Sequence, residues 1–162
     1  MIRLLLTGGT IDKTYDEING VLNFPHTNIE QMLKISRSYV PVEVTKLFLK
    51  DSLDLNDHDR KTVVDACTAA VEDKIIITHG TDTMTQTAAE IFKANIQGKV
   101  IVLTGSLVPF SFGPNSDALF NLGTALAFAQ ILKPGVYIAM NGQYFSADQV
   151  HKDNNLGIFK PN

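Results

Sequence analysis

Two short segments of this sequence place threonine hydroxyls beside glycines where an apolar run ends. In the first, the run Ile2–Leu6 leads into Thr7-Gly8-Gly9-Thr10. Paired glycines allow a sharp turn and a close backbone approach to a ligand, and Thr10 then displays its hydroxyl. Because this hydroxyl is a weak nucleophile that needs a base, the segment predicts either a nucleophile loop or a plain glycine-rich turn with a capping threonine. A phosphate loop and a dinucleotide fingerprint are excluded, since neither Gly-Lys-Ser/Thr nor a third glycine follows.

The second segment, His79-Gly80-Thr81-Asp82-Thr83-Met84, joins another apolar run to a helical pattern. In the plainer interpretation Thr81 or Asp82 caps that helix, because its oxygen accepts the free N–H groups of the first turn. Alternatively, Asp82 holds a substrate ammonium group or orients a catalytic lysine. Lys152 is the candidate: in a dry cleft a lysine has a lowered pKa and acts as a base, whereas near the surface it is simply solvated.

Metal and serine-hydrolase chemistry find no support in the residue pattern. The histidines His26, His58, His79 and His151 are spread along the chain, and none pairs with another histidine or with Cys67 at metal-ligand spacing. The cysteine lies on the apolar stripe of an expected helix, which indicates an inert core residue. No Gly-x-Ser-x-Gly elbow is present. We therefore expect no metal and no cofactor.

Short apolar runs alternate with longer helical patterns, which is typical of a parallel sheet covered by helices. The expected strands are Ile2–Leu6, Val42–Leu49, Lys74–Thr78, Lys99–Thr104 and Gly135–Met140. The expected helices are residues 27–35, opened by a capping box of Thr27 and Glu30, then 57–72, 83–95 and 116–132. Three strands are nearly continuous in apolar residues, which favours burial on both faces. The sequence predicts a three-layer α/β fold: a mostly parallel sheet with helices on both faces, Rossmann- or flavodoxin-like.

Two segments fit neither pattern. Residues 11–24 contain Asn19-Gly20, a hairpin-turn signal, so we expect a loop or hairpin flap that is flexible over residues 12–22. Asn141–His151 is also expected to be a loop, following the fifth strand. Ligands of an open parallel sheet bind beyond the carboxyl ends of its strands, and these loops belong to that edge.

Length and charge narrow the class of protein. The 162 residues fit one domain, 1–162, and a composition of 44% hydrophobic and 19% charged residues is globular. Fourteen basic and seventeen acidic residues give a net charge of −3, which argues against nucleic-acid binding through phosphate contacts. We see no signal-peptide core and no run that could span a membrane, and the single cysteine fits a reducing compartment, so a cytoplasmic protein is expected.

Taken together and in order, these segments resemble the N-terminal domain of the bacterial-type L-asparaginases. Thr7-Gly8-Gly9-Thr10-Ile11 is similar to the first active-site signature of the family, and Thr78-His79-Gly80-Thr81-Asp82-Thr83-Met84 is similar to the second. Three further segments resemble members of the family: residues 103–109, 117–122 and 159–162. The resemblance therefore extends over nearly the whole chain.

The resemblance implies catalytic roles for five residues. Thr10 matches the nucleophilic threonine of the first signature. Thr81, Lys152 and Asp82 match a relay made of a second threonine, a lysine and an aspartate. Tyr15, in the expected flap, is the counterpart of a mobile catalytic tyrosine. Backbone N–H groups that follow Thr81 are expected to hold the developing oxyanion.

The resemblance also implies a substrate site. Ser52 matches the serine that binds the substrate carboxylate, and Asp82 contacts the substrate ammonium group. Gly9, Gly80 and Ser106 are expected to line the same site. Because the catalytic and carboxylate-binding residues each follow an expected parallel strand, we expect Thr10, Ser52, Thr81, Asp82 and Lys152 to converge in one cleft at the carboxyl edge.

The chain also departs from the family pattern. Family members carry a second domain, and the neighbouring subunit's second domain supplies an acidic residue to the substrate ammonium; this chain stops where the linker to it would begin. Leu53 stands where many members have glutamine, and Leu107-Val108-Pro109 replaces Met-Arg-Pro. We therefore expect a pocket that is more open and more apolar, and a homo-oligomer, most simply a dimer, with an interface unlike the family's usual one.

Three functions follow from this sequence. The first is an asparaginase-like amidohydrolase that converts a small amide such as L-asparagine to the acid and ammonia through a threonine nucleophile. The second is a catalytically weak or inactive binding module for aspartate, asparagine or a similar ligand. The third is the amide-hydrolysing subunit of a tRNA-dependent amidotransferase, which would work with a partner chain.

Overall fold

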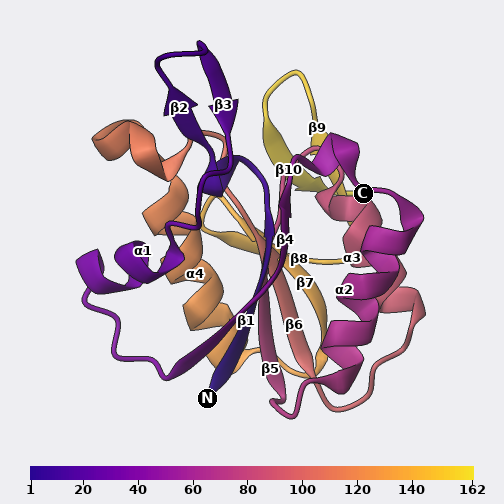
Figure 1. Cartoon of the computed structure of the whole chain (residues 1–162). Coiled ribbons are helices and arrows are strands. Elements are labelled where there is room, and N and C mark those ends of the chain that lie inside the picture. Colours follow the sequence, from indigo (N-terminus) through magenta and orange to yellow (C-terminus); the bar gives the residue numbers. More distant parts are fainter.

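The computed structural model describes residues 1–162 and shows a central sheet between two helical layers (Figure 1). Six strands form the sheet in the order β4-β1-β5-β6-β7-β8. Their bounds are β1 Ile2–Gly8, β4 Val42–Lys50, β5 Lys74–Thr78, β6 Val100–Thr104, β7 Gly135–Met140 and β8 Gln143–Ser146. The helices are α1 Ile29–Ile35, α2 Asp57–Ala69, α3 Met84–Lys93 and α4 Ala118–Ile131. Two separate hairpins pair β2 Thr14–Asp16 with β3 Val21–Asn23, and β9 Val150–Asp153 with β10 Ile158–Pro161.

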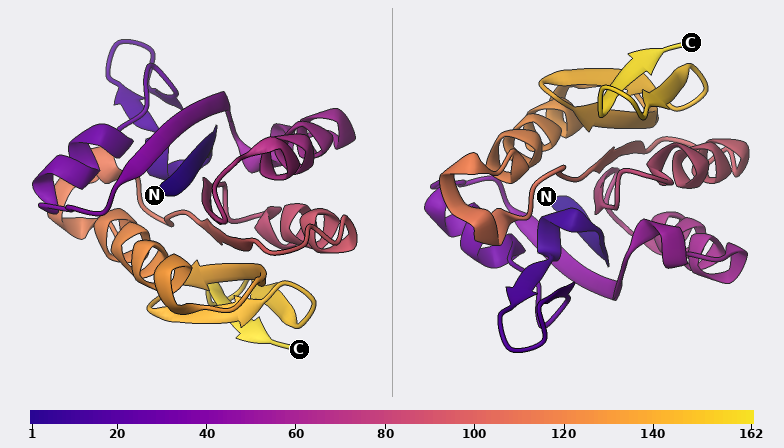
Figure 2. Two further views of the ribbon diagram at one scale, coloured as in Figure 1. Left: turned by 90° about the horizontal axis from the view of Figure 1, so that it is seen from below. Right: turned by 90° about the horizontal axis from the view of Figure 1, so that it is seen from above.

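The three-layer architecture and all five expected strands are confirmed. Helices α1 and α4 cover one face of the sheet and α2 and α3 cover the other (Figure 2). In β5, Ile75 and Ile77 belong to the core that includes Val63 of α2, whereas Ile76 belongs to the core that includes Leu122 of α4. Because successive side chains of a strand point to opposite faces, a strand between two helical layers needs an unbroken apolar run.

The strand order creates a topological switch point next to β1. The strands β1, β4, β5, β6 and β7 run parallel, and in chain order they have the flavodoxin-like arrangement 2-1-3-4-5. The chain leaves β1 toward β4 on one side and later returns to β5 on the other. Connections that depart in opposite directions leave a crevice between the carboxyl ends of β1 and β5. The loops that begin at Gly9 and at His79 lie at this crevice.

The prediction of a loop over Asn141–His151 is wrong. Strand β8 forms there as an antiparallel edge strand on β7, and β9 begins at Val150. Of the four residues in β8 only Phe145 is buried in the core, while the ring of Tyr144 packs edge-on against Phe128 of α4. Asn141 and Gly142, with φ values of +55° and +78°, form the two-residue turn between β7 and β8, so an Asn-Gly hairpin signal marks this segment as well.

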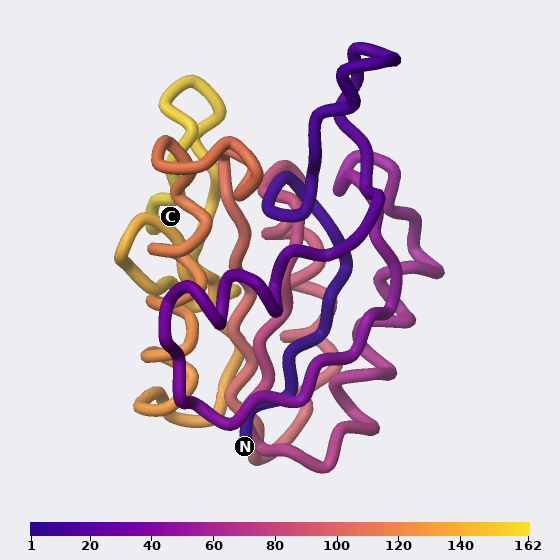
Figure 3. The backbone as a smooth tube through the Cα atoms, turned by 60° about the vertical axis from the view of Figure 1, so that its left-hand side comes forward, coloured from indigo at the N-terminus to yellow at the C-terminus, as the bar shows by residue number.

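The expected flap is a two-stranded hairpin that projects from the carboxyl edge of the sheet (Figures 1 and 3). Its turn contains Gly20, whose φ is +68°, and the carboxylate of Asp16 accepts the backbone N–H groups of Ile18 and Asn19. The hairpin expectation is confirmed in this form. The flexibility of residues 12–22 stays a prediction.

The local signal at the start of α1 is overridden by a contact made over a longer distance. The capping box of Thr27 and Glu30 is wrong, because α1 begins at Ile29 and the hydroxyl of Thr27 donates to the carboxylate of Asp12 at 2.9 Å. The four main helices otherwise lie within the expected ranges. None of them is both long and apolar enough to cross a membrane.

Candidate active site at the carboxyl edge of the sheet

The loop that carries Thr10 leaves β1 through two glycines with unusual backbone angles. Gly8 has a φ of +96°, and Gly9 has a φ of +81° with a ψ of 178°, a region essentially reserved for glycine. A Cβ atom on Gly9 would collide with the backbone of Gly80, and one on Gly8 would lie 2.5 Å from the backbone nitrogen of Lys50. The glycines therefore let the Thr10 loop pack directly on the loop that follows β5.

The loop after β5 packs in turn on Ser52, which follows β4. A Cβ atom on Gly80 would lie 2.6 Å from both Cβ and Oγ of Ser52. The hydroxyl of Thr83 donates to the backbone oxygen of Ser52 at 2.8 Å. Ser52 is buried, yet its own hydroxyl makes no hydrogen bond within the chain. Three strand ends thus bring Thr10, Gly80 and Ser52 into one contiguous group of loops.

Lys152 reaches this group from the opposite end of the sequence. Its Nζ donates to Oγ1 of Thr81 at 2.9 Å and to Oδ1 of Asp82 at 2.5 Å. The side chain of Lys152 is only 11% exposed, whereas that of Asp82 is 49% exposed. The amine is therefore held inside the protein between a buried hydroxyl and a carboxylate that faces solvent. The alternative of a solvated Lys152 is wrong.

The position of Lys152 depends on the β9–β10 hairpin. In the antiparallel register Lys152 lies opposite Phe159, whose ring is buried in the core with residues of α3 and β7. This pairing fixes the strand from which the lysine extends. Figure 1 shows the hairpin rising at the same end of the sheet as β2 and β3.

The capping interpretation of the second threonine segment is wrong. Helix α3 begins at Met84, preceded by Thr83, and no side chain caps it. Thr81 and Asp82 are instead turned toward Lys152. The backbone N–H groups of Gly80, Thr81 and Asp82 donate no hydrogen bond within the chain. Free N–H groups beside a hydroxyl and an amine form a surface that can bind a negatively charged oxygen.

Two of the expected site residues, Tyr15 and Ser106, occupy different surroundings. Tyr15 lies on β2, is 56% exposed, and its hydroxyl lies near Gly20 at the hairpin turn, so the structure does not bring it to Thr10. Ser106 is buried, and its hydroxyl donates to the backbone oxygen of Val108 within its own turn. Leu53 is 70% exposed beside Ser52.

Two contacts that the sequence analysis missed support the Thr10 loop. Lys13 forms an ion pair with Asp51, which links the end of this loop to the residue before Ser52. Asp12 is fully buried, and its carboxylate accepts the backbone N–H of Asn28 at 2.8 Å. Burial raises the pKa of Asp12, because the charged form loses its hydration. Both contacts join residues distant in sequence, and neither residue pair has a local signal.

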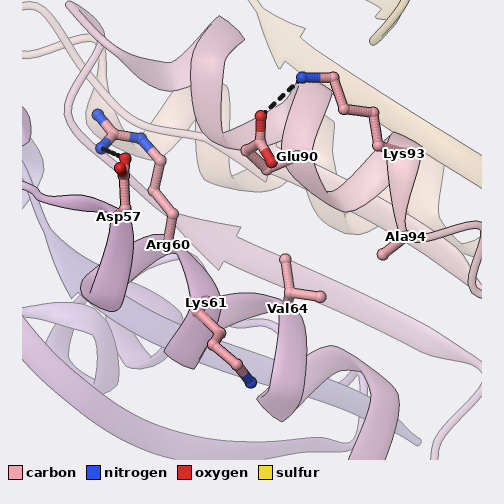
Figure 4. Close-up of a pocket in the computed structure, with 7 residues that line it drawn as sticks. All are labelled: Asp57, Arg60, Lys61, Val64, Glu90, Lys93 and Ala94. Atoms are coloured by element: carbon pink, nitrogen blue, oxygen red, sulfur yellow. Dashed lines mark hydrogen bonds and ion pairs between the residues drawn. The ribbon is translucent and has the colours of Figure 1, made fainter.

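The group of loops forms an open edge, since none of the five hollows of the molecule is lined by Thr10, Thr81 or Lys152. The hollow drawn in Figure 4 lies between α2 and α3 instead. Two ion pairs lie within its lining, Arg60 with Asp57 at 3.8 Å and Lys93 with Glu90 at 2.8 Å, while Lys61 pairs with Asp65 along α2 at 2.6 Å. No group of three histidine, cysteine or acidic side chains is arranged to hold a metal ion.

The fold and these loops define a doubly wound α/β domain with a site of two threonines and a lysine at its switch point. The family model described as "Asparaginase, N-terminal" matches residues 1–158, and the chain belongs to the asparaginase family. The L-asparaginase of Thermococcus kodakarensis is 35% identical over 96% of this chain and 48% of its own length. A subunit of the glutamyl-tRNA(Gln) amidotransferase of Aeropyrum pernix is 29% identical over 88% of this chain and 35% of its own length.

Solved structures agree with this assignment. The thermostable L-asparaginase of Thermococcus kodakarensis superposes with a TM-score of 0.84 at 33% identity, covering 99% of this chain and 51% of its own. The probable cytoplasmic L-asparaginase of Campylobacter jejuni superposes with a TM-score of 0.81 at 28% identity, and the match covers 99% of this chain and 52% of that structure's chain. The chain therefore spans about half the length of the relatives it matches.

Proposed function

We propose that the chain is an asparaginase-like amidohydrolase that converts a small amide such as L-asparagine to the acid and ammonia, with Thr10 as the nucleophile. The contact between Lys152 Nζ and Thr81 Oγ1 at 2.9 Å carries this proposal. This contact gives a proton a route from Thr81 to Lys152. The same loop carries Gly80, which packs against Gly9, the residue before Thr10. A threonine becomes a useful nucleophile only where such a proton acceptor is close.

The proposed reaction has two steps. The Oγ1 atom of Thr10 attacks the amide carbon and loses its proton through Thr81, or through a water molecule, to the neutral form of Lys152. The C–N bond then breaks, and the nitrogen takes up a proton and leaves as ammonia. In the second step water attacks the acyl-threonine, which releases the acid and restores the hydroxyl. Asp82 holds the lysine amine throughout.

Substrate binding follows from the same loops. The unpartnered hydroxyl of Ser52 binds the substrate carboxylate, and the exposed oxygen of Asp82 binds the substrate ammonium. The free N–H groups of Thr81 and Asp82 stabilise the oxyanion that forms during attack; one such donor is worth about 10²–10³ in rate. The reaction needs no cofactor. We assign Gly9 and Gly80 to the close contact between the loops after β1 and β5. We assign Tyr15 to closure of the flap over bound substrate, and Ser106 to the shape of the turn that borders the site.

Ammonia release by the purified chain tests this function. We expect turnover of L-asparagine or another small amide, and a loss of most of it in Thr10→Ala. The matched control is Thr7→Ala, because Thr7 lies before the glycines and its hydroxyl donates to the backbone oxygen of Thr78 at 2.7 Å. Undiminished hydrolysis by Thr10→Ala would refute the mechanism.

A binding module is the second candidate, and the exposure of Leu53 beside Ser52 favours it, because an apolar side chain there offers the substrate no polar contact. Calorimetric titration with aspartate separates the two functions. Binding of aspartate together with no ammonia from any amide tested would select the module. Ammonia production only after addition of a second chain would select an amidase subunit that works with a partner.

We further propose a cytoplasmic homo-oligomer, most simply a dimer. The single cysteine, buried and unpaired, supports a reducing compartment. The open edge and the exposed apolar side chains of Leu53, Leu107 and Leu156 support a second copy covering this end of the molecule. Light scattering at several concentrations measures the assembly, and a monomer at all of them would contradict it.

A further inference from the structure

His79, directly after β5, is a fully buried titratable side chain near the candidate site, and the proposed reaction does not use it. Its exposed fraction is zero, and both ring nitrogens have partners. Nδ1 lies 2.8 Å from the backbone oxygen of Gly80, and Nε2 lies 2.8 Å from Oγ1 of Thr87 on α3. The backbone N–H of His79 donates to Thr104 on β6, so the residue is also anchored to the neighbouring strand.

These partners determine where the ring proton lies. A carbonyl oxygen only accepts, so Nδ1 must carry the hydrogen that it donates to Gly80. Burial lowers the pKa of His79 to about 4, which leaves the ring neutral at neutral pH. In the neutral ring Nε2 is an acceptor, and it receives the hydroxyl hydrogen of Thr87. The imidazole therefore has one tautomer and one orientation.

The bond from His79 fixes the plane of the next peptide group. In a trans peptide, the oxygen of Gly80 and the N–H of Thr81 point to opposite sides of the plane, and this chain has no cis peptide bond. Holding the oxygen against His79 turns the Thr81 N–H away from the core. That N–H donates to no acceptor within the chain. Glycine at position 80 has little intrinsic preference that would hold the plane by itself.

We propose that His79 is a positioning residue: its neutral imidazole, oriented by Thr87, holds the Gly80–Thr81 peptide so that the Thr81 N–H faces the reacting carbonyl oxygen. This inference rests on the proposed amidohydrolase function. The N–H would bind the oxyanion of the transition state more strongly than the carbonyl of the substrate. Loss of the orientation should therefore lower kcat and leave KM nearly unchanged.

A matched pair of amide substitutions tests the proposal. In His79→Asn the side-chain N–H occupies the place of Nδ1 and keeps the bond to Gly80. In His79→Gln the amide reaches the place of Nε2 instead, and the bond to Gly80 is lost. We expect kcat of His79→Asn to stay within about tenfold of wild type and kcat of His79→Gln to fall by about 10²–10³, the effect of one oxyanion donor. Equal losses of kcat in both variants would overturn the inference.

A measurement on the wild-type chain separates this inference from the proposed function. Nitrogen-15 NMR of the histidine ring reports the tautomer without any substrate and without relying on the variants to fold. We expect a neutral ring with the proton on Nδ1 at about pH 7. A proton on Nε2 or a charged ring would overturn the inference even in an active enzyme. Absence of amide hydrolysis beside the expected NMR signal would refute the proposed function, and the positioning role of His79 in it, but not the geometry.

Discussion

The buried imidazole of His79 should make the protein lose stability in mild acid. Its pKa is about 4 in the folded chain against an ordinary value of 6.5, because burial disfavours the charged ring. Between these two values the unfolded chain binds a proton that the folded chain does not. The contribution of His79 to stability is therefore complete above the unfolded pKa and is lost as the pH falls toward the folded pKa.

The size of this loss follows from the two pKa values. Each pKa unit corresponds to about 1.4 kcal/mol. Relative to neutral pH, the titration of His79 should therefore lower the unfolding free energy by about 2 kcal/mol at about pH 5 and by about 3 kcal/mol at about pH 4. A loss of this size is a large fraction of the stability of an ordinary domain.

Urea unfolding followed by circular dichroism measures the effect. Wild type and His79→Asn are compared at about pH 7 and at about pH 5, at constant ionic strength, because the asparagine has no charge to gain. All other titratable groups are shared, so the change in the difference between the two proteins isolates His79. We expect wild type to lose about 2 kcal/mol more than the variant. Equal losses would refute the burial of a neutral ring.

Four further outcomes are expected, three from substitutions and one from the unchanged chain. Gly9→Ala should lower unfolding free energy by about 2–5 kcal/mol in urea, whereas Gly98→Ala, with a φ of +74° but no neighbour within 4 Å, should cost only about 1–2 kcal/mol. Lys152→Met should reduce ammonia release by about 10²–10⁴ with an unchanged circular dichroism spectrum. Because the pKa of Asp12 is raised, wild type should lose thermal stability relative to Asp12→Asn as the pH rises through that pKa; parallel melting curves would contradict this. Hydrogen exchange over residues 12–22 should be faster than in the central strands; equal protection would count against a flexible flap.

The central strands were predictable because they are buried on both faces. A run such as Ile75-Ile76-Ile77 needs apolar cover on both sides, and the three nearly continuous apolar runs are the parallel strands β5, β6 and β7. The edge strand β4 has no buried residue, and its alternating pattern predicted it instead. Strand β8 was missed, since only Phe145 among its four residues is buried. A local signal was nevertheless present, because the two-residue turn Asn141-Gly142, with φ values of +55° and +78°, joins β7 to β8 as a hairpin.

Some residues of the candidate site could likewise be placed from local sequence, and others could not. Thr10, Thr81 and Asp82 stand in glycine-rich segments after strong strands, so their placement at one edge follows from the local sequence. Lys152 extends from a strand that is held by Phe159, which no local pattern indicates. The bond from the Thr27 hydroxyl to Asp12 overrode a capping box, because a buried carboxylate must find hydrogen-bond donors.

Trapping the acyl-enzyme tests the central proposal most directly. Purified chain is mixed with excess L-asparagine, quenched in acid at successive times and digested, and the peptides are examined by mass spectrometry for an added aspartyl group. We predict that the group appears on the peptide that contains Thr10, as an ester at this residue, and that Lys152→Met accumulates less of it. Ammonia release with the aspartyl group on Thr81 instead, or with Thr10 unmodified at every time, would contradict the assignment of Thr10 as the nucleophile.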